Sequence, residues 1–496
     1  MAEKRNGVSA VAAGGEGLPQ TVRRVLVLGA SRSGSSAAVA LARLGVEVVL
    51  SDRRRPESLP GLDEVFRAGV RFAGEETLGE QWPRPDLVVK SPGVPSEATP
   101  VQLARDRGVP VWSELELAYA LLPNAFDAVT GTNGKTTTTA LLGHLFAVAD
   151  RPARVLGNIG VAVTSVAGGI DPAEELVVEV SSFQLEDTHS FRPAVGVFIN
   201  LTPDHLDRHG TMERYLACKA GLFARQGPGD VAVLNLSDPA VAAVGVELAA
   251  RPGGPRVVYF SVADRDSVPA AGEAVGLRSG EAVRPQSWVE GDWIFLEEEP
   301  IVRVDEIRLP GRHNLENCLA AGTAALARGI DKAAVAEGLR TFKGVAHRLE
   351  TAGMVAGVTY VNDSKATNVE ATLTALNAYP ENTLLILGGR DKASDYRPVA
   401  RACARGCKAV YVIGEATSLI ESAFADVRER EGLHGVPEIC ACGDLERAVR
   451  AAFETALIGD VVLLAPACAS FDQYQNFEER GEHFRELVGR LGGNGS

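Results

Sequence analysis

Long apolar runs are missing from this chain of 496 residues. No stretch approaches the ~20 apolar residues that a membrane-spanning helix needs. The opening sequence MAEKRNGVSAVAAGGEGLPQ lacks the hydrophobic core of a signal peptide, and we expect residues 1–20 to form a disordered tail. These absences predict a cytoplasmic protein.

An excess of basic charge is also missing, because 50 Lys and Arg stand against 64 Asp and Glu, for a net charge of -14. Affinity for nucleic-acid backbone or an anionic membrane depends on clustered Lys and Arg. We therefore expect neither partner, and a monomer that acts on small molecules. Any anionic substrate must be held by local features.

Cysteine is sparse and scattered, with seven residues in the chain. Cys403/Cys407 and Cys440/Cys442 are the close pairs, and they lack the repeated spacing of a zinc site. A chain without disulfides, from a reducing compartment, is the simplest interpretation.

What the chain does contain is a repeated alternation of short apolar strands, glycine turns and helical segments, which is typical of α/β folds with parallel sheets. At roughly 100–200 residues per domain, the length predicts about three domains. Within the second domain, residues 290–292 suggest a hairpin and residues 314–330 a helix. The predicted divisions are a tail over 1–20, a Rossmann-like domain over 21–115, a central P-loop-type domain over 116–343 and a Rossmann-like C-terminal domain over 344–496.

The stretch AVTGTNGKTTTT, residues 128–139, predicts a phosphate-binding loop. Gly131 and Gly134 allow a tight turn, Lys135 can reach phosphate oxygens, and Thr136 can ligate magnesium. The following helix would present its N-terminus to the phosphates. A strict motif has glycine where this chain has Val129, so a solvated turn with an ordinary helix cap is the alternative.

A phosphate loop needs a carboxylate near its magnesium ion, usually at the end of a neighbouring strand. Glu179 ends the apolar run in ELVVEVSSFQLE and is the candidate, whereas we expect Glu186 to be a helix residue. An exposed charge at a strand end is the alternative for Glu179.

NLTPDHLDRHG places two acids and two histidines after another apolar strand, where they could ligate a metal, contact a substrate or form an ordinary polar loop. The histidines are His205 and His209. Lys219 lies in a mainly helical segment, and by spacing alone we expect it to be a surface lysine without function.

GASRSG near the N-terminus is similar to a dinucleotide fingerprint, but Ser31 replaces the middle glycine that lets backbone approach a pyrophosphate. NAD binding is therefore a weak alternative. The sequence is still compatible with an anionic or nucleotide-like ligand at the start of this helix.

The third domain has polar loops after successive apolar strands, in NDSKATN, GGRDK and ACASFDQYQNFEERG. Lys365 and Lys392 could neutralise carboxylate or phosphate groups, with Thr367 and Ser470 as hydroxyl donors. Each lysine alone is more often a solvated surface charge, but several such loops at one sheet edge favour a site.

Together these motifs resemble the Mur ligase family over about residues 23–490. GTNGKTTTT, SSFQLE and HRLE resemble the superfamily broadly, and NDSKATN and ACASFDQYQNFEERG are similar to its D-glutamate-adding member. The resemblance implies ATP and Mg²⁺ as cofactors, with a UDP-substrate-binding first domain, an ATP-binding second and an amino-acid-binding third. The implied reaction joins UDP-N-acetylmuramoyl-L-alanine to D-glutamate through an acyl phosphate, in peptidoglycan precursor synthesis.

The resemblance also implies site residues. For ATP they are Gly131, Thr132, Asn133, Gly134, Lys135, Thr136, Thr137, Asn314, Arg348 and Asp363. For the UDP substrate they are Ser31, Arg32, Asp52, Arg54, Asn158 and His205. For D-glutamate they are Lys365, Thr367, Lys392, Ser470 and Phe477. The catalytic set is Lys135, Glu179, His205 and Lys219, and the metal set is Thr136, Glu179, His205 and Lys219 as a carbamate.

Three rivals stay open. Another ligase of the superfamily, such as a folylpolyglutamate synthase, would keep the central motifs but lack the two C-terminal ones. A nucleotide-dependent binding switch would bind ATP without amino-acid-dependent turnover. A nicotinamide dehydrogenase is the third.

Overall fold

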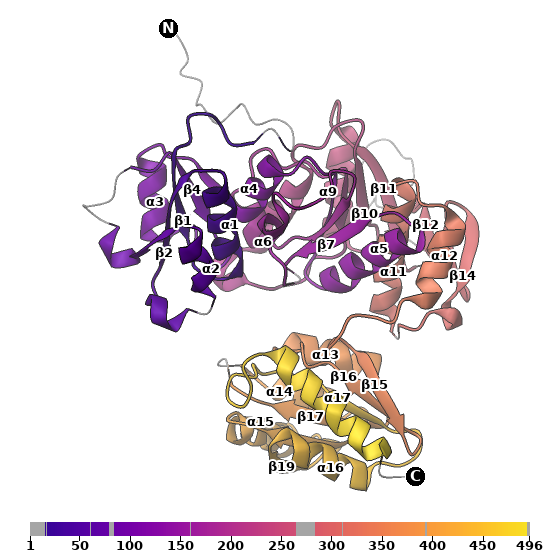
Figure 1. The fold of residues 1–496 in the computed structure, drawn as a ribbon. Helices are drawn as coiled ribbons and strands as arrows, with labels where there is room; N and C mark the ends of the chain where they lie inside the picture. The colour runs from indigo at the N-terminus through magenta and orange to yellow at the C-terminus, as the bar shows by residue number, and fades with distance from the viewer. Residues whose placement is uncertain are drawn as a thin grey trace. The chain divides into compact units, whose positions relative to one another are not determined.

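The computed structural model describes residues 15, 17–59, 61–78, 84–158, 160–263, 283–309, 311–391 and 394–493. The chain contains three parallel-rich sheets with helices packed on them (Figure 1), so the expected α/β class is confirmed. It forms two compact units. One comprises Met1–Ile307 with His313–Phe342, and the other Arg308–Arg312 with Lys343–Ser496. The divisions at residues 20, 115 and 343 stay predictions, and most of the predicted tail lies outside the described residues.

The first sheet is fully parallel, in the order β3-β2-β1-β4-β5. In such a doubly wound sheet, ligands bind beyond the carboxyl ends of the strands where the order reverses, which here is between β1 and β4. The elements are β1 Arg24–Leu28, α1 Arg32–Arg43, β2 Glu47–Asp52, α2 Leu62–Arg67, β3 Arg71–Gly74, β4 Leu87–Lys90, α3 Thr99–Asp106, β5 Val111–Ser113 and α4 Glu114–Leu121.

The second sheet has nine strands in the order β14-β13-β12-β11-β10-β9-β6-β8-β7, and β13 runs antiparallel to both of its neighbours, β12 and β14. The strands are β6 Phe126–Thr130, β7 Ala153–Gly157, β8 Glu175–Glu179, β9 Val195–Phe198, β10 Val231–Asn235, β11 Arg256–Ser261, β12 Ser287–Glu290, β13 Trp293–Leu296 and β14 Glu299–Arg303. The hairpin expected at residues 290–292 is confirmed, because β12 pairs antiparallel with β13.

Among the residues that the structure describes, seven helices accompany this sheet, and α5 packs against α12 (Figure 1). They are α5 Lys135–Val148, α6 Ser182–Leu185, α7 Leu206–His209, α8 Met212–Ala220, α9 Pro239–Ala250, α11 Arg312–Ala327 and α12 Lys332–Thr341. The helix predicted over 314–330 is therefore confirmed as α11, which begins two residues earlier.

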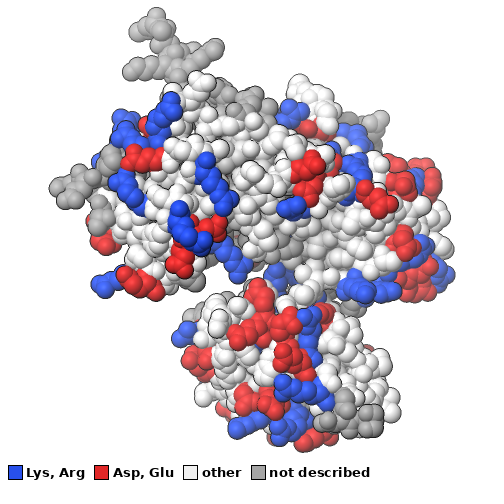
Figure 2. Space-filling model, in the orientation of Figure 1, with Lys and Arg blue, Asp and Glu red and all other residues white. Residues whose placement is uncertain are grey.

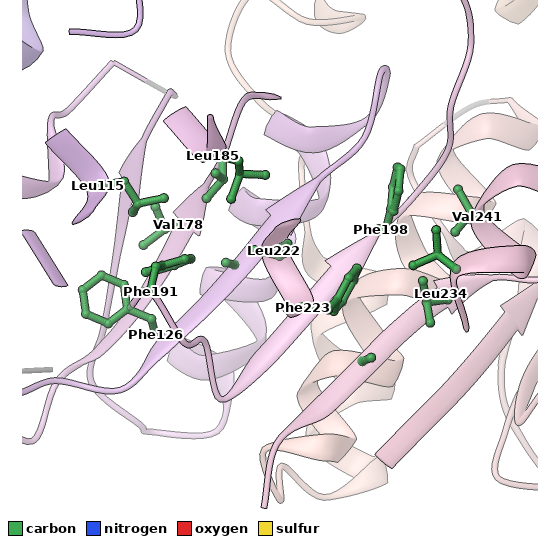
Figure 3. Packing of buried hydrophobic residues seen from close by; sticks show 14 of the residues in the cluster. Leu115, Phe126, Val178, Leu185, Phe191, Phe198, Leu222, Phe223, Leu234 and Val241 are labelled. Carbon is green, nitrogen blue, oxygen red and sulfur yellow. The ribbon is translucent and has the colours of Figure 1, made fainter. Parts of the chain in front are cut away.

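The core of the second sheet is built from strand residues whose side chains alternate between its faces. Figure 3 shows Phe126, Val178, Phe198 and Leu234, which come from four neighbouring strands and belong to one buried cluster. Leu115 of α4 belongs to the same cluster, so the helix that follows the first sheet is packed into the core of the second.

The third sheet lies wholly in the second unit, in the order β15-β16-β20-β17-β18-β19, with β15 antiparallel. Its strands are β15 Glu350–Val355, β16 Val358–Asn362, β17 Thr383–Gly388, β18 Cys407–Ile413, β19 Ile439–Gly443 and β20 Val461–Leu464. Its helices are α13 Val369–Ala378, α14 Arg397–Cys403, α15 Thr417–Arg430, α16 Leu445–Thr455 and α17 Phe477–Gly493.

Surface charge is mixed. On the face in Figure 2, Lys and Arg lie interspersed with Asp and Glu over both units. Among the residues that the structure describes, no helix has the length and apolar character needed to cross a membrane.

A buried carboxylate attaches α4 to the loop before β9. Glu116 is 1% exposed and accepts hydrogen bonds from the backbone N–H groups of His189, Ser190 and Phe191, at 2.9, 2.7 and 3.1 Å. It also accepts one from the Ser190 hydroxyl. Hydrogen bonds to an ionised acceptor are stronger than neutral ones, so this side chain stabilises the connection between the first two sheets.

Replacing Glu116 with alanine should destabilise the first unit by about 2–4 kcal/mol, because three backbone N–H groups, of which that of Phe191 is buried, lose their acceptor. All four tryptophans of the chain lie before residue 294, so tryptophan fluorescence during urea unfolding reports on this unit. Glu64→Ala is the control, because Glu64 is exposed and pairs with Arg43 at the surface. Equal midpoints for the two variants would contradict the assigned role of Glu116.

Candidate active site

The predicted phosphate loop connects β6 to α5, in the strand, loop, helix order that the motif requires. Gly134 has a φ of 82° and packs so closely that a Cβ there would lie 2.2 Å from Oδ1 of Asn317. Glycine is therefore needed both for its conformation and for the space. Val129 is a fully buried residue of β6, which explains why the strict motif fails there without loss of the loop.

Side-chain contacts hold the loop in place. Asn200 Oδ1, just after β9, accepts from the backbone N–H groups of Thr132 at 3.1 Å and Asn133 at 2.9 Å. Lys135 Nζ donates to the carbonyls of Gly131 at 3.0 Å and Thr132 at 2.7 Å. The lysine therefore lies over the turn, at the positive end of α5, where a phosphate would be favoured. Nothing in the sequence motif indicated Asn200.

Thr136 and Glu179 meet in the interior. The Thr136 hydroxyl donates to Glu179 Oε2 at 2.9 Å, and Asn158 Nδ2 donates to Oε1 at 3.0 Å. Glu179 is 2% exposed, so the alternative of an exposed strand-end charge is wrong. A hydroxyl and a carboxylate at this separation are the oxygen donors that magnesium prefers. Thr137, the next residue of α5, is also buried.

Lys219 is buried, which corrects the expectation from spacing that it is a surface lysine. It lies in α8 with 1% exposure, and its Nζ donates to the Gly131 carbonyl at 2.7 Å. Nζ also lies 4.7 Å from the centre of the Tyr215 ring. Burial, and then the charge of Lys135, lowers the pKa of Lys219 well below its ordinary value. Burial therefore favours the uncharged form of this side chain over the charged one.

His205 lies at the N-terminus of α7 in the left-handed conformation, with a φ of 52°. Its side chain is 48% exposed, with Nε2 3.3 Å from Asp204 and the ring edge-on to Phe183 at 4.9 Å. No described contact joins it to Glu179 or Lys219. The structure thus brings Thr136, Glu179 and Asn158 together and leaves His205 at the edge.

Asn314 of α11 belongs to the surroundings of the phosphate loop. Its Oδ1 accepts from Asn317 Nδ2 at 3.0 Å, and Asn317 Oδ1 accepts from the Thr138 hydroxyl of α5 at 3.1 Å. This buried chain links the predicted adenine contact to the helix that follows the loop. Asn317 was missed by sequence reasoning because helical spacing alone does not show what a residue faces.

The first sheet has a pocket of about 440 Å³ beyond the ends of its strands, as its topology predicts. Ser31, Asp52 and Arg54 line it. Asp52 accepts from the Ala30 N–H at 2.8 Å and pairs with Arg54 at 3.0 Å. Burial opposes the charge of Asp52, but the hydrogen bonds from Arg54 and Ala30 outweigh it and lower its pKa to about 2.

Arg32 lies outside that pocket. It lines a neighbouring hollow of about 370 Å³, and its Nη1 donates to the Gly160 carbonyl at 3.3 Å, in the segment that also contains Asn158. Five of the predicted UDP-substrate residues are thus divided between the pocket and this segment, and the sixth, His205, lies at the start of α7.

In the second unit, Arg348 and Asp363 lie near each other at the end of β16. Asp363 Oδ1 accepts from the Leu349 N–H at 3.2 Å. Burial raises the pKa of Asp363 to about 6, although the charge of Arg348 opposes this rise.

The predicted D-glutamate residues surround the same end of the third sheet. Lys365 Nζ lies 5.8 Å from the centre of the Phe477 ring, and the Thr367 N–H donates to the Lys365 carbonyl at 2.8 Å. Ser470 is buried and its carbonyl accepts from the backbone of Tyr474 at 2.8 Å. Lys392 lies outside the described residues.

Arg480 holds these loops together and was not singled out from the sequence. It is 1% exposed and donates to the Ser364 hydroxyl at 3.0 Å and to the carbonyls of Ser364, Cys468 and Ala469 at 2.9, 3.2 and 3.4 Å. Burial lowers its pKa to about 10, which still leaves it charged at neutral pH. The motif NFEERG thus supplies a cation that fixes the two loops carrying Lys365 and Ser470.

Two family models match the chain. The Mur ligase middle domain matches residues 129–325, and the glutamate ligase domain of Mur ligases matches residues 347–468. The first match contains the phosphate loop, Glu179 and Lys219, and the second contains Arg348, Asp363 and Lys365.

Solved structures share the fold. A MurF ligase from Thermotoga maritima, solved in complex with ADP, is 17% identical with a TM-score of 0.55, over 95% of this chain and 100% of that one. The UDP-N-acetylmuramate-alanine ligase MurC from the same organism is 19% identical with a TM-score of 0.54, over 95% and 99%.

Curated relatives match nearly end to end. UDP-N-acetylmuramoylalanine--D-glutamate ligase from Pelotomaculum thermopropionicum is 44% identical over 94% of this chain and 98% of its own length. The enzymes of the same name from Acidobacterium capsulatum and Desulfitobacterium hafniense are 42% and 40% identical, again over 94% of this chain. At this identity and coverage, the chain belongs to the Mur ligase family.

Proposed function

We propose that this chain forms the amide bond between UDP-N-acetylmuramoyl-L-alanine and D-glutamate at the expense of ATP, in peptidoglycan precursor synthesis. The observation that carries the proposal is the 40–44% identity, over 94% of the chain, to relatives named for this reaction. The phosphate loop and the polar loops of the third sheet supply matching chemistry. We also propose that the enzyme is cytoplasmic and monomeric.

In the first step, the terminal phosphoryl group of ATP passes to the L-alanine carboxylate and gives an acyl phosphate. Positioning and charge neutralisation dominate such transfers. Lys135 would leave its loop carbonyls and bind the phosphate oxygens, while the N–H groups of the loop and of α5 hold the remaining charge. Asn314, Arg348 and Asp363 would contact the adenine nucleotide.

Magnesium fits the donors of this site. Thr136 and Glu179 already place their oxygens 2.9 Å apart, and His205 adds a nitrogen donor at the edge. A lysine cation would repel the metal, but the lowered pKa of Lys219 favours carbamylation, which converts the amine into a carboxylate-like ligand. Bound magnesium would neutralise the charge that develops on the phosphoryl oxygens.

In the second step, the neutral amine of D-glutamate attacks the acyl carbon, and phosphate leaves as the amide forms. Lys365 and Lys392 would bind the carboxylates of the incoming amino acid, with Thr367 and Ser470 as hydroxyl donors and Phe477 as an apolar wall. Ser31, Arg32, Asp52, Arg54, Asn158 and His205 would contact the UDP substrate. An acyl phosphate hydrolyses readily, so the reacting groups must be kept from water.

The direct test is the release of ADP from purified protein with Mg²⁺, ATP and UDP-N-acetylmuramoyl-L-alanine. D-glutamate, L-glutamate and no amino acid are compared. We expect turnover with D-glutamate alone. ATP binding without amino-acid-dependent turnover would favour a nucleotide switch, and turnover with another amino acid would overturn the assigned specificity.

Lys135→Ala should reduce turnover at least about a hundredfold, because removing one preorganised donor to a developing anion costs roughly 2.7–4 kcal/mol. ADP release under saturating substrates measures this loss. Lys332→Ala is the matched control, because Lys332 pairs with Glu299 near the surface at 2.9 Å, remote from the loop in sequence. Turnover within a few-fold of the unmodified enzyme would remove the phosphate-loop assignment.

Lys219→Ala should lose most activity and regain part of it in formate or acetate, since a free carboxylate can occupy the place of the carbamate. ADP release is measured against carboxylate concentration. Lys135→Ala provides the control, because a carboxylate cannot replace a cation and should give no recovery. Absence of any rescue of Lys219→Ala would count against carbamylation.

A further inference from the structure

Three side chains with carboxylate, imidazole and thiol donor atoms converge outside the magnesium donors. Glu186 follows α6, His209 ends α7, and Cys218 lies in α8 next to Lys219. One ligand atom from each lies within 4.8 Å of the other two. The proposed reaction uses none of these three residues.

The ring of His209 is fixed by its neighbours. It stacks on Phe183 at 5.4 Å and lies 5.0 Å from the Tyr215 ring. Nε2 and the Ser182 hydroxyl are 3.0 Å apart, which occupies that nitrogen and leaves Nδ1 for another partner. A hydrogen bond to the far ring nitrogen is how ligating histidines are usually oriented.

Glu186 is oriented in a similar way. Its Oε2 accepts from Lys90 at 3.0 Å, Ser96 at 3.0 Å and Arg208 at 2.8 Å. Its Oε1 lies 4.0 Å from His209 Nδ1. Oε2 therefore has three donors, while Oε1 lies toward the imidazole nitrogen of His209.

We propose that Glu186, His209 and Cys218 bind a thiophilic divalent cation such as Zn²⁺, and that its binding inhibits the enzyme. Sulfur, nitrogen and oxygen donors together suit zinc, whereas magnesium prefers oxygen alone. Tetrahedral bonds of ~2.0–2.3 Å place ligand atoms about 3.3–3.8 Å apart, so the cluster needs to contract by roughly 1 Å. Water would complete the coordination.

A zinc ion would bind Cys218 as a thiolate. Lys90 also pairs with Asp187 at 2.7 Å, and Arg105 pairs with the same carboxylate at 2.7 Å, so three cations contact the carboxylates of Glu186 and Asp187. When the metal–sulfur bond forms, the Cys218 thiol releases its proton to solvent. The thiolate would partly neutralise the charge of the metal ion. Metal binding should therefore depend strongly on Cys218.

Binding would act on the magnesium donors through the two helices that supply the ligands. His205 immediately precedes α7, which ends with His209. Lys219 directly follows Cys218 in α8. Contraction of the cluster would therefore displace both residues, and an error of about 1 Å in a catalytic group can cost around a hundredfold in rate.

Binding is tested with Co²⁺ on the full-length protein, because thiolate ligation gives cobalt a near-ultraviolet charge-transfer absorption that Zn²⁺ abolishes. We expect one equivalent of this signal in the unmodified protein and in Cys440→Ser, which removes an exposed thiol 3.8 Å from Cys442. The signal should vanish in Cys218→Ser and Cys218→Ala. No charge-transfer signal, or one that survives in both Cys218 variants, overturns the site.

Inhibition rests on the proposed function and is measured as ADP release in saturating Mg²⁺ with increasing Zn²⁺. Cys218→Ser should keep the uninhibited rate and need at least about tenfold more Zn²⁺ for half-inhibition, since even outer-shell changes cost metal sites 10–100-fold. Equal zinc sensitivity in both proteins overturns the inhibitory role. If the protein has no ligase activity without zinc but still gives the cobalt signal, the proposed function is contradicted. The proposed metal site would then still be supported.

Discussion

The chemistry of the first unit depends on the pairing of β6 between β8 and β9. The register places Val129 opposite Glu179 and Thr130 opposite Phe198. Because all three strands run parallel, their carboxyl ends meet at one sheet edge, and the loop, the carboxylate and Asn200 emerge there together. A shift of this register by one residue would turn Glu179 to the opposite face of the sheet and separate it from Thr136.

The buried side chains at that edge differ in their hydrogen-bond partners. Glu179 keeps two hydrogen-bond donors, from Thr136 and Asn158. Lys219 has a carbonyl acceptor in Gly131 instead of an ion pair among the described contacts, and burial lowers its pKa. In the second unit, Arg480 is as buried as Lys219, but it donates hydrogen bonds to three carbonyls and a hydroxyl. It remains charged and organises the loops around it.

Much of this could be predicted from the sequence, where local signals are strong. The glycine-lysine-threonine turn after an apolar run predicted a phosphate loop. The end of the apolar run that forms β8 predicted Glu179 as the carboxylate near it. Asn200, Asn317 and Arg480 were not found, because their roles depend on long-range contacts that no spacing records. The expectation from spacing that Lys219 lies at the surface was wrong for the same reason. A helical lysine next to apolar residues has the same sequence pattern whether its side chain faces water or a loop carbonyl.

The path of the backbone between the units has a practical consequence for protein engineering. Residues 308–312 belong to the second unit although residues 313–342 return to the first. The second unit is therefore discontinuous in sequence. A chimera that exchanges only the segment after residue 342 with a relative would combine five residues of one parent with the remainder of another, so recombination between family members needs matched crossovers on both sides of α11 and α12.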